Sequence, residues 1–392
     1  MKPTRRFVMI LLLTFILAPV AGRADEPTEP IRIGVLYATS GSGAVVGSPT
    51  LRGHEMAVAE INAAGGILGR TVVSHVRDTK LKPATAASAA RELITRDGVD
   101  VLIGGVTSAE GLAISQVARE EQVVYIATVP KTVQLTREKF HRHVFRTAAN
   151  TDTEGLGIAR LLGSLGIEKV CQIQFDYAYG HDLAAGIEKV LAAEAPGATI
   201  VTDLKVKLGT TDFSSQIAQI MASECTGVAS GLWGGTFVNL AQQGKPFGLF
   251  DKVKYISGGE IGAHEIAGQM KGNYPDNVWA NSYELWYHDS SPQSAEFHRK
   301  LAAQAGTEQT SAWPVMGYIG VQLFAAAVEK AQSLEDDALI SALEGLTIQT
   351  PVGPRTIDPK THEANTGQFW GPMKKSPDRD YRIMDPVTYI GP

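Results

Sequence analysis

Short apolar segments of strand length alternate with longer segments of helix length, and this alternation constrains the fold more than any other feature of the sequence. In the first part of the chain, the predicted strands cover residues 31–36, 71–76, 99–103 and 123–127, and the predicted helices cover 51–64, 85–94 and 111–120. Neighbouring parallel strands need a long crossover, usually a helix, whereas antiparallel strands need only a turn. The alternation therefore predicts a parallel sheet covered by helices on both faces.

A second round of the same pattern begins after residue 150. Predicted helices at 154–165, 181–194, 213–223 and 237–243 alternate with predicted strands at 169–174, 199–205, 227–232 and 253–256. The length of 392 residues also favours two domains. We therefore predict an α/β protein with two Rossmann-like lobes, and a ligand site in the cleft where the carboxyl ends of the strands meet.

The first 24 residues predict a secretory signal peptide rather than part of the fold. Basic residues precede an apolar run at 7–17, and small residues lead to a cleavage site that we place after Ala24. The apolar run is shorter than the roughly 20 residues that span a bilayer. We therefore expect an exported protein of the periplasm.

The two cysteines, Cys171 and Cys225, lie in or just before two predicted strands of the second round. In an oxidising compartment they either form a disulfide or remain two buried thiols, and the sequence does not decide between these states.

Other function classes find little support in the sequence. The net charge is −5 with no basic cluster, which argues against a nucleic-acid partner, and no Cys/His group has metal-ligand spacing. The glycine-rich segment 41–47 has the spacing G-x-G-x-x-x-G, one residue longer than a dinucleotide fingerprint, and we expect the next helix to begin only near Thr50. An exported NAD(P)-dependent oxidoreductase is therefore a distant alternative, and we expect no cofactor.

One strand end, residues 102–111, has the composition of an anion-binding site. An apolar strand runs into Gly104-Gly105, then Thr107 and Ser108, and a helix that we expect to start at about Gly111. The first N–H groups of a helix lack intrahelical acceptors and attract anions. Ser108 either donates a hydrogen bond to a small carboxylate there or caps the helix.

Short patches rich in glycine, aromatic and hydroxyl residues are spread over nearly all of the chain after residue 30. They are Ile33-Gly34-Val35, Ser40-Gly41, Gly47, Gly53, Ala57, Ile61-Asn62, Gly65-Gly66-Ile67, Gly69-Arg70, Ile103–Ser108, Leu135-Thr136, Phe145-Arg146-Thr147, Asp176–Gly180 and Thr350–Pro354. In order and spacing they resemble the leucine/isoleucine/valine-type periplasmic binding proteins. The resemblance implies two lobes joined by a hinge of three crossover strands, with residues 28–149 plus 282–347 in lobe 1 and 150–281 plus 348–392 in lobe 2.

The resemblance also implies a function and a set of ligand-binding residues. The protein would be a non-enzymatic monomer that hands a small solute to the permease and ATPase subunits of an inner-membrane ABC importer. The implied positions are Ser108 with Thr107 before it for the ligand carboxylate, Val129 and Lys131 for its amino group, Tyr179 and Trp233 for the pocket wall, Glu260 for an ammonium, and Val46 on the first lobe.

Two of these positions depart from the family pattern. Lys131 would repel an α-ammonium and attract a carboxylate, although Glu260 could neutralise it, and Val46 stands where amino-acid binders tend to have an aromatic ring. The sequence therefore leaves two solute classes open, a hydrophobic or branched-chain amino acid and an aromatic or aliphatic acid or amide. A ligand-sensing subunit for a signalling partner is the alternative to transport.

Overall fold

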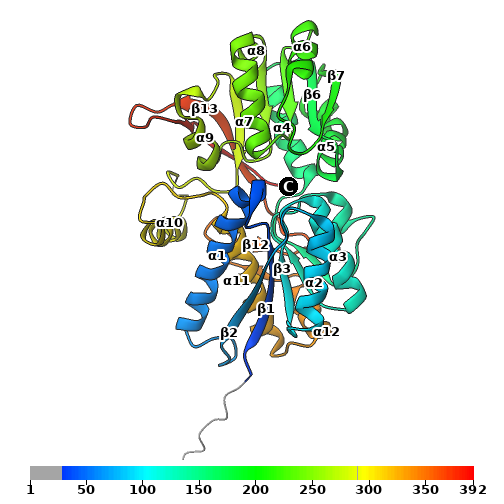
Figure 1. Ribbon diagram of the computed structural model, residues 1–392, viewed down its shortest axis with the longest axis vertical. Helices are drawn as coiled ribbons and strands as arrows, with labels where there is room; N and C mark the ends of the chain where they lie inside the picture. Colours follow the sequence, from blue (N-terminus) through cyan, green and yellow to red (C-terminus); the bar gives the residue numbers. More distant parts are fainter. Residues whose placement is uncertain (1–28, 289) are drawn as a thin grey trace, which may run out of the picture.

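The computed structural model describes residues 29–288 and 290–392, which form two α/β lobes with the C-terminus between them (Figure 1). The predicted signal peptide, residues 1–24, lies outside the described residues. Within the described part of the chain, no helix has the length and apolar character needed to cross a membrane.

Lobe 1 is built on a five-stranded parallel sheet in the order β2-β1-β3-β4-β5. The strands are β1 Ile31–Tyr37, β2 Val72–Asp78, β3 Val101–Gly104, β4 Tyr125–Ala127 and β5 Val144–Arg146, and the helices are α1 Ala44–Ala63, α2 Pro83–Thr95, α3 Ser108–Glu121, α10 Pro292–Ala305, α11 Pro314–Ala331 and α12 Asp336–Leu343. Alternate residues of a strand face opposite sides of a sheet. Ile33 and Val35 accordingly pack with α1 and α11, while Leu36 packs with α2 and α3, as predicted for a sheet covered on both faces.

Lobe 2 is built on a larger sheet in the order β7-β6-β8-β9-β10-β13-β14, with β15 also paired to β13. The strands are β6 Lys169–Phe175, β7 Thr199–Val206, β8 Gly227–Ser230, β9 Lys254–Ser257, β10 Val278–Ser282, β13 Gln368–Lys375, β14 Arg382–Met384 and β15 Thr388–Ile390, and the helices are α4 Thr151–Ser164, α5 Ala178–Glu194, α6 Ser214–Ala222, α7 Gly234–Gly244, α8 Leu249–Lys252 and α9 His264–Met270. Strands β6 to β10 are parallel, and the C-terminal strands add antiparallel pairs. Cys171 in β6 and Cys225 before β8 form a disulfide.

The chain passes between the lobes three times, after β5, after β10 and after the small hairpin β11 Thr347–Ile348 and β12 Arg355–Thr356. Short 3-10 helices lie at η1 Gly41–Gly43, η2 Val133–Thr136, η3 Lys245–Phe247 and η4 Lys271–Asn273. The first and third crossovers are tied together, since Arg146 forms an ion pair with Glu363 and Asn150 Nδ2 donates to Glu363 Oε2 at 2.7 Å. The division of the chain between lobes stays a prediction. The presence of Ile357 and Ala364 in the core of lobe 1 favours a return to lobe 2 only after residue 364.

Helix α1 begins earlier than the sequence analysis predicted. It starts at Ala44 rather than near Thr50, directly after η1. At Gly47 a Cβ atom would lie 2.1 Å from the carbonyl oxygen of Ala38, so only glycine lets the first turn pack this closely against the end of β1. Gly43 and Gly47, which indicated a loop, are therefore packing contacts against Ala38, and Val46 in the first turns of the helix is buried.

Candidate ligand-binding site

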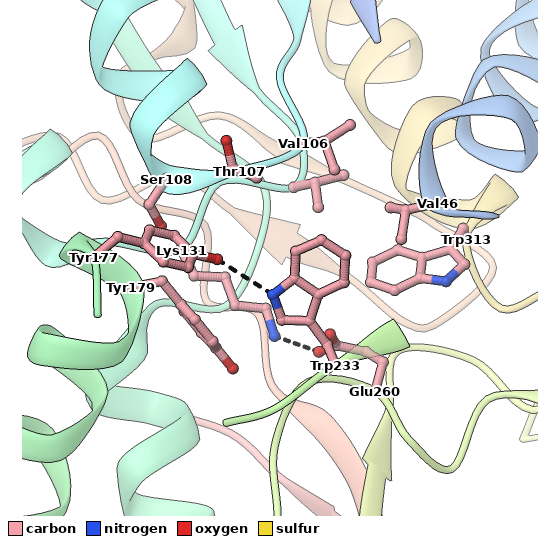
Figure 2. Close-up of a pocket in the computed structure, with 11 residues that line it drawn as sticks. Val46, Val106, Thr107, Ser108, Lys131, Tyr177, Tyr179, Trp233, Glu260 and Trp313 are labelled. Atoms are coloured by element: carbon pink, nitrogen blue, oxygen red, sulfur yellow. Dashed lines mark hydrogen bonds and ion pairs between the residues drawn. The ribbon is translucent and has the colours of Figure 1, made fainter. Parts of the chain in front are cut away.

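A pocket with about 370 Å³ of space not filled by protein atoms lies between the lobes (Figure 2). Its lining comes from lobe 1 and from the starts of α5 and α7 and the loop after β9 in lobe 2, and consists of Val46, Val106, Thr107, Ser108, Val129, Lys131, Tyr177, Tyr179, Trp233, Glu260 and Trp313. Every residue that the sequence analysis placed in the site lies in this pocket. Their contact with a ligand stays a prediction.

The start of α3 differs from the prediction in a way that bears on the site. The helix begins at Ser108 rather than at Gly111, and its cap is Thr107, which forms a capping box with Glu110. Thr107 Oγ1 accepts from the Glu110 N–H at 3.2 Å and donates to Glu110 Oε2 at 2.9 Å. The Thr107 hydroxyl is therefore fully used within the helix start, and Ser108 is free of the capping role.

Ser108 is 2% exposed and its Oγ accepts a hydrogen bond from the Thr132 N–H at 3.2 Å. No described residue accepts a hydrogen bond from its O–H group. The N–H groups of Ser108 and Ala109 belong to the first turn, where a helix offers no acceptor. The N-terminus of a helix also carries partial positive charge, so this strand end has the donors and the electrostatic field of a carboxylate-binding site. The Ser108 hydroxyl and the N–H groups of Ser108 and Ala109 are called the carboxylate seat below.

Aromatic rings form much of the pocket wall. Trp233, the residue before α7, donates from Nε1 to the Tyr177 hydroxyl at 3.2 Å, and the ring of Tyr179 lies beside them. On lobe 1, Trp313 lies beside Val46 in Figure 2 and packs edge-on against Tyr283. Trp313 thus supplies an aromatic ring on lobe 1, where Val46 alone suggested that one was absent.

A buried ionic cluster forms the polar side of the pocket. Lys131 follows β4 in lobe 1, and its ammonium forms ion pairs with Glu154 of α4 at 2.8 Å and with Glu260 after β9. Lys131 is 5% exposed, Glu154 is 0% exposed and Glu260 is 3% exposed. Lys131 is therefore a pocket residue rather than a solvated surface lysine.

Both carboxylates of the cluster are held by further donors. Glu154 Oε1 also accepts from the Gly259 N–H at 2.9 Å and from Asn281 Nδ2 at 3.2 Å. Glu260 Oε1 also accepts from Asn281 Nδ2 at 3.3 Å and from Gln368 Nε2. Glu260 has a φ of 54°, which is uncommon for a residue other than glycine, and its N–H donates to Asn281 Oδ1 at 2.7 Å. The backbone and its neighbours thus fix the Glu260 carboxylate against Lys131.

The ionisation of the cluster follows from burial and charge together. Burial alone would lower the pKa of the Lys131 ammonium, but the carboxylates of Glu154 and Glu260 raise that pKa above its ordinary value. Burial raises the pKa of Glu260, the Lys131 charge opposes this shift, and the charge of Glu154 adds to it. Lys131 is therefore charged at neutral pH, and it is the group that lets two carboxylates share one buried site.

Further contacts join the lobes beside the pocket. The Thr132 hydroxyl bonds the carboxylate of Asp182 on α5, and Gln134 Nε2 donates to Asp182 Oδ1 at 3.1 Å. On another side of the cleft, Ser311 donates to Glu265 of α9. The lobes are thus in contact around the pocket rather than apart.

Sequence reasoning missed some members of the site. Tyr177 and Val106 are neighbours of predicted residues, whereas Trp313 is the residue before α11 and lies far along the chain from the other lining residues. No sequence pattern pointed to Glu154 as a member of the site. It lies in the first turn of α4 and contacts Gly259, which is 105 positions away in the chain. Over residues 29–288 and 290–392, no three His, Cys, Asp or Glu side chains are grouped to hold a metal ion.

Comparison with known proteins places this geometry in context. The sequence pattern of the family described as Periplasmic binding protein matches residues 30–375. The Leu/Ile/Val-binding protein homolog 8 of Brucella abortus (strain 2308) is 28% identical over 337 residues, which cover 82% of this chain and 83% of that protein.

Two solved structures share the fold over most of the chain. A solute-binding protein of an ABC transporter from Rhodopseudomonas palustris BisB5, in complex with 3,4-dihydroxybenzoic acid, superposes with a TM-score of 0.82 at 23% identity, covering 93% of this chain and 98% of that one. The branched-chain amino acid transporter substrate-binding protein LivJ from Streptococcus pneumoniae, in complex with isoleucine, has a TM-score of 0.80 at 21% identity, covering 93% and 100%.

Proposed function

This chain belongs to the periplasmic binding protein family, and we propose on that premise that it captures a small carboxylate-bearing solute for an ABC importer. The observation that carries the proposal is the pocket shared by the lobes, which has free donors at the start of α3 on one side and aromatic rings on the other. The named relative is a Leu/Ile/Val-binding homologue, and the two solved neighbours hold an aromatic acid and isoleucine. All three names fit a small solute with a carboxylate.

Capture proceeds by hinge closure and involves no chemical conversion. The solute first places its carboxylate at the Ser108 hydroxyl and the N–H groups of the first turn of α3. Lobe 2 then rotates on the three crossovers and brings Tyr179, Trp233 and Glu260 onto the other side of the solute. Because the solute contacts both lobes only in the closed form, its binding shifts the population toward closure.

The setting follows from the proposed role. The signal peptide is cleaved after Ala24, the mature chain is a monomer in the periplasm, and the closed form docks on the permease, whose ATPase subunits drive transport. A sensing role would use the same pocket and the same closure. Uptake of labelled solute separates the two roles. It is measured in cells that lack the protein and in the same cells after its gene is returned, and only an importer subunit restores accumulation of the solute.

A thermal-shift screen tests the proposal. The mature chain is heated with amino acids, aromatic acids, aliphatic acids and amides, each in turn. A solute at 100 times its Kd stabilises the folded state by about 2.7 kcal/mol, which raises the Tm by several degrees. Small-angle scattering should show a smaller radius of gyration with the same solute. If no carboxylate raises the Tm, the proposed function is wrong.

A further inference from the structure

An amino acid carries a carboxylate and an ammonium, and a closed pocket must supply a partner for each. Burying a charge without a partner is costly, because the site cannot replace the water that the charge loses. The donors at the start of α3 account for the carboxylate. The question for this pocket is therefore which group would accept an ammonium.

The one carboxylate that lines the pocket among the described residues is Glu260. Its Oε1 already accepts hydrogen bonds from the Lys131 ammonium, Asn281 and Gln368, while no described residue donates to its Oε2. Glu154 lies behind Glu260, and Glu154 Oε1 accepts hydrogen bonds from Lys131, Gly259 and Asn281. An incoming ammonium would therefore have to share Glu260 with a lysine that is already seated there.

The charge of Lys131 makes such sharing unfavourable. Lys131 lines the same pocket, and closure removes the water that would screen two ammonium groups from each other. For a solute without an ammonium the same lysine is no obstacle, since it is held in ion pairs with both Glu154 and Glu260. The protein thus carries its own ammonium where an amino acid would bring one.

Aromatic and valine side chains make up the remaining lining. Tyr177, Tyr179, Trp233 and Trp313 present rings, and Val46, Val106 and Val129 are the valines of the lining. Stacked and edge-on contacts to such rings favour a planar apolar group. No other described lining residue offers a charge to a second polar group of the solute.

We infer that the solute is a hydrophobic carboxylic acid without an α-amino group, best matched by an aromatic acid, and that Lys131 is the residue that excludes the corresponding amino acids. This inference rests on the proposed function, because it assumes that the pocket captures a carboxylate. It chooses between the two solute classes that the sequence left open.

Calorimetry on the mature chain with matched pairs tests the inference. The pairs are 3-phenylpropanoate with phenylalanine, and 4-methylpentanoate with leucine, in which the members differ only by the α-ammonium. We expect the acid of a pair to bind at least about tenfold more tightly than its amino acid, since the ammonium loses water and must share Glu260 with the charge of Lys131. Tighter binding of phenylalanine or leucine than of the matched acid would overturn the inference while leaving the proposed function intact. Failure of all four compounds and of benzoate to bind would overturn the proposed function and the inference with it.

Variants then assign the preference to Lys131. Lys131→Met frees Glu260 for an ammonium, so the ratio of acid to amino-acid affinity should fall at least about tenfold, since a hydrogen bond to a charged group is gained. Lys139→Met, which removes an exposed lysine nearby in the chain, should leave the ratio unchanged. Lys131→Met leaves two buried carboxylates without a cation. The double variant with Glu154→Gln is therefore made in parallel, because it returns the cluster to its wild-type net charge. An unchanged ratio in the folded variant would show that Lys131 does not set the preference.

Discussion

Replacing Ser108 by alanine tests the carboxylate seat directly. The Ser108 hydroxyl lies in the first turn of α3, accepts a hydrogen bond from Thr132, lines the pocket and donates to no described residue. The substitution removes one oxygen atom and leaves the backbone N–H groups of the seat in place. It therefore isolates the contribution of a single donor.

The size of the effect follows from these contacts. A hydrogen bond to a charged group contributes about 1.5–3 kcal/mol, so Ser108→Ala should weaken carboxylate binding by about 10- to 150-fold. The variant also loses the bond from the Thr132 N–H, which should lower the free energy of unfolding by about 0.5–1.5 kcal/mol. Binding and stability therefore need separate measurements.

Ser115→Ala is the matched control. Ser115 lies on the same helix, is also 2% exposed, and forms one hydrogen bond, to His141 Nε2 at 2.7 Å, away from the pocket. Denaturant unfolding should show similar losses of stability for the two variants. Calorimetry with the best solute of the thermal-shift screen should show weaker binding for Ser108→Ala alone. Equal affinity in both variants and the wild type would refute the assignment of Ser108 to the seat.

Other predictions concern stability. Burial raises the pKa of Glu265 from 4.5 to about 7. The folded state therefore holds this proton more tightly than the unfolded state does. The contribution of Glu265 to the free energy of unfolding is thus complete below about pH 4.5 and is lost as the pH rises through 7. Across this pH range, the free energy of unfolding of Glu265→Gln, measured with denaturant, should fall by up to about 3 kcal/mol less than that of the wild type. Parallel pH profiles of the two proteins would contradict this. Replacing both Cys171 and Cys225 by serine should lower the free energy of unfolding by about 2–4 kcal/mol, and an unchanged denaturation midpoint would count against the disulfide. At Gly53 a Cβ would lie 1.8 Å from the carbonyl of the first residue of α11, so Gly53→Ala should cost at least about 2 kcal/mol in thermal unfolding, whereas Gly272→Ala, which meets no atom, should cost less than about 0.5 kcal/mol.

The alternation of apolar strands and helices was enough to predict both lobes, because it reflects local periodicity that any parallel α/β sheet requires. The resemblance to a family then located Ser108, Lys131 and Glu260 at the pocket. Neither kind of reasoning found Glu154, because its role depends on a contact between residues 105 positions apart that only the packed lobes create. Gly43 and Gly47 misled the prediction of α1, since their tertiary packing against Ala38 overrides the local preference of glycine for a loop.

The location of the ionic cluster has a consequence for kinetics. Lys131 and Thr132 belong to lobe 1, while their partners Glu154, Glu260 and Asp182 belong to lobe 2. Opening the cleft must separate these pairs as well as the contacts of the solute with lobe 2, so part of the barrier to opening is a property of the protein. We therefore expect every solute to share one contribution to its release rate from these pairs, in addition to the contribution from its own contacts with lobe 2. Release during transport would then be timed by the docked permease pulling these pairs apart.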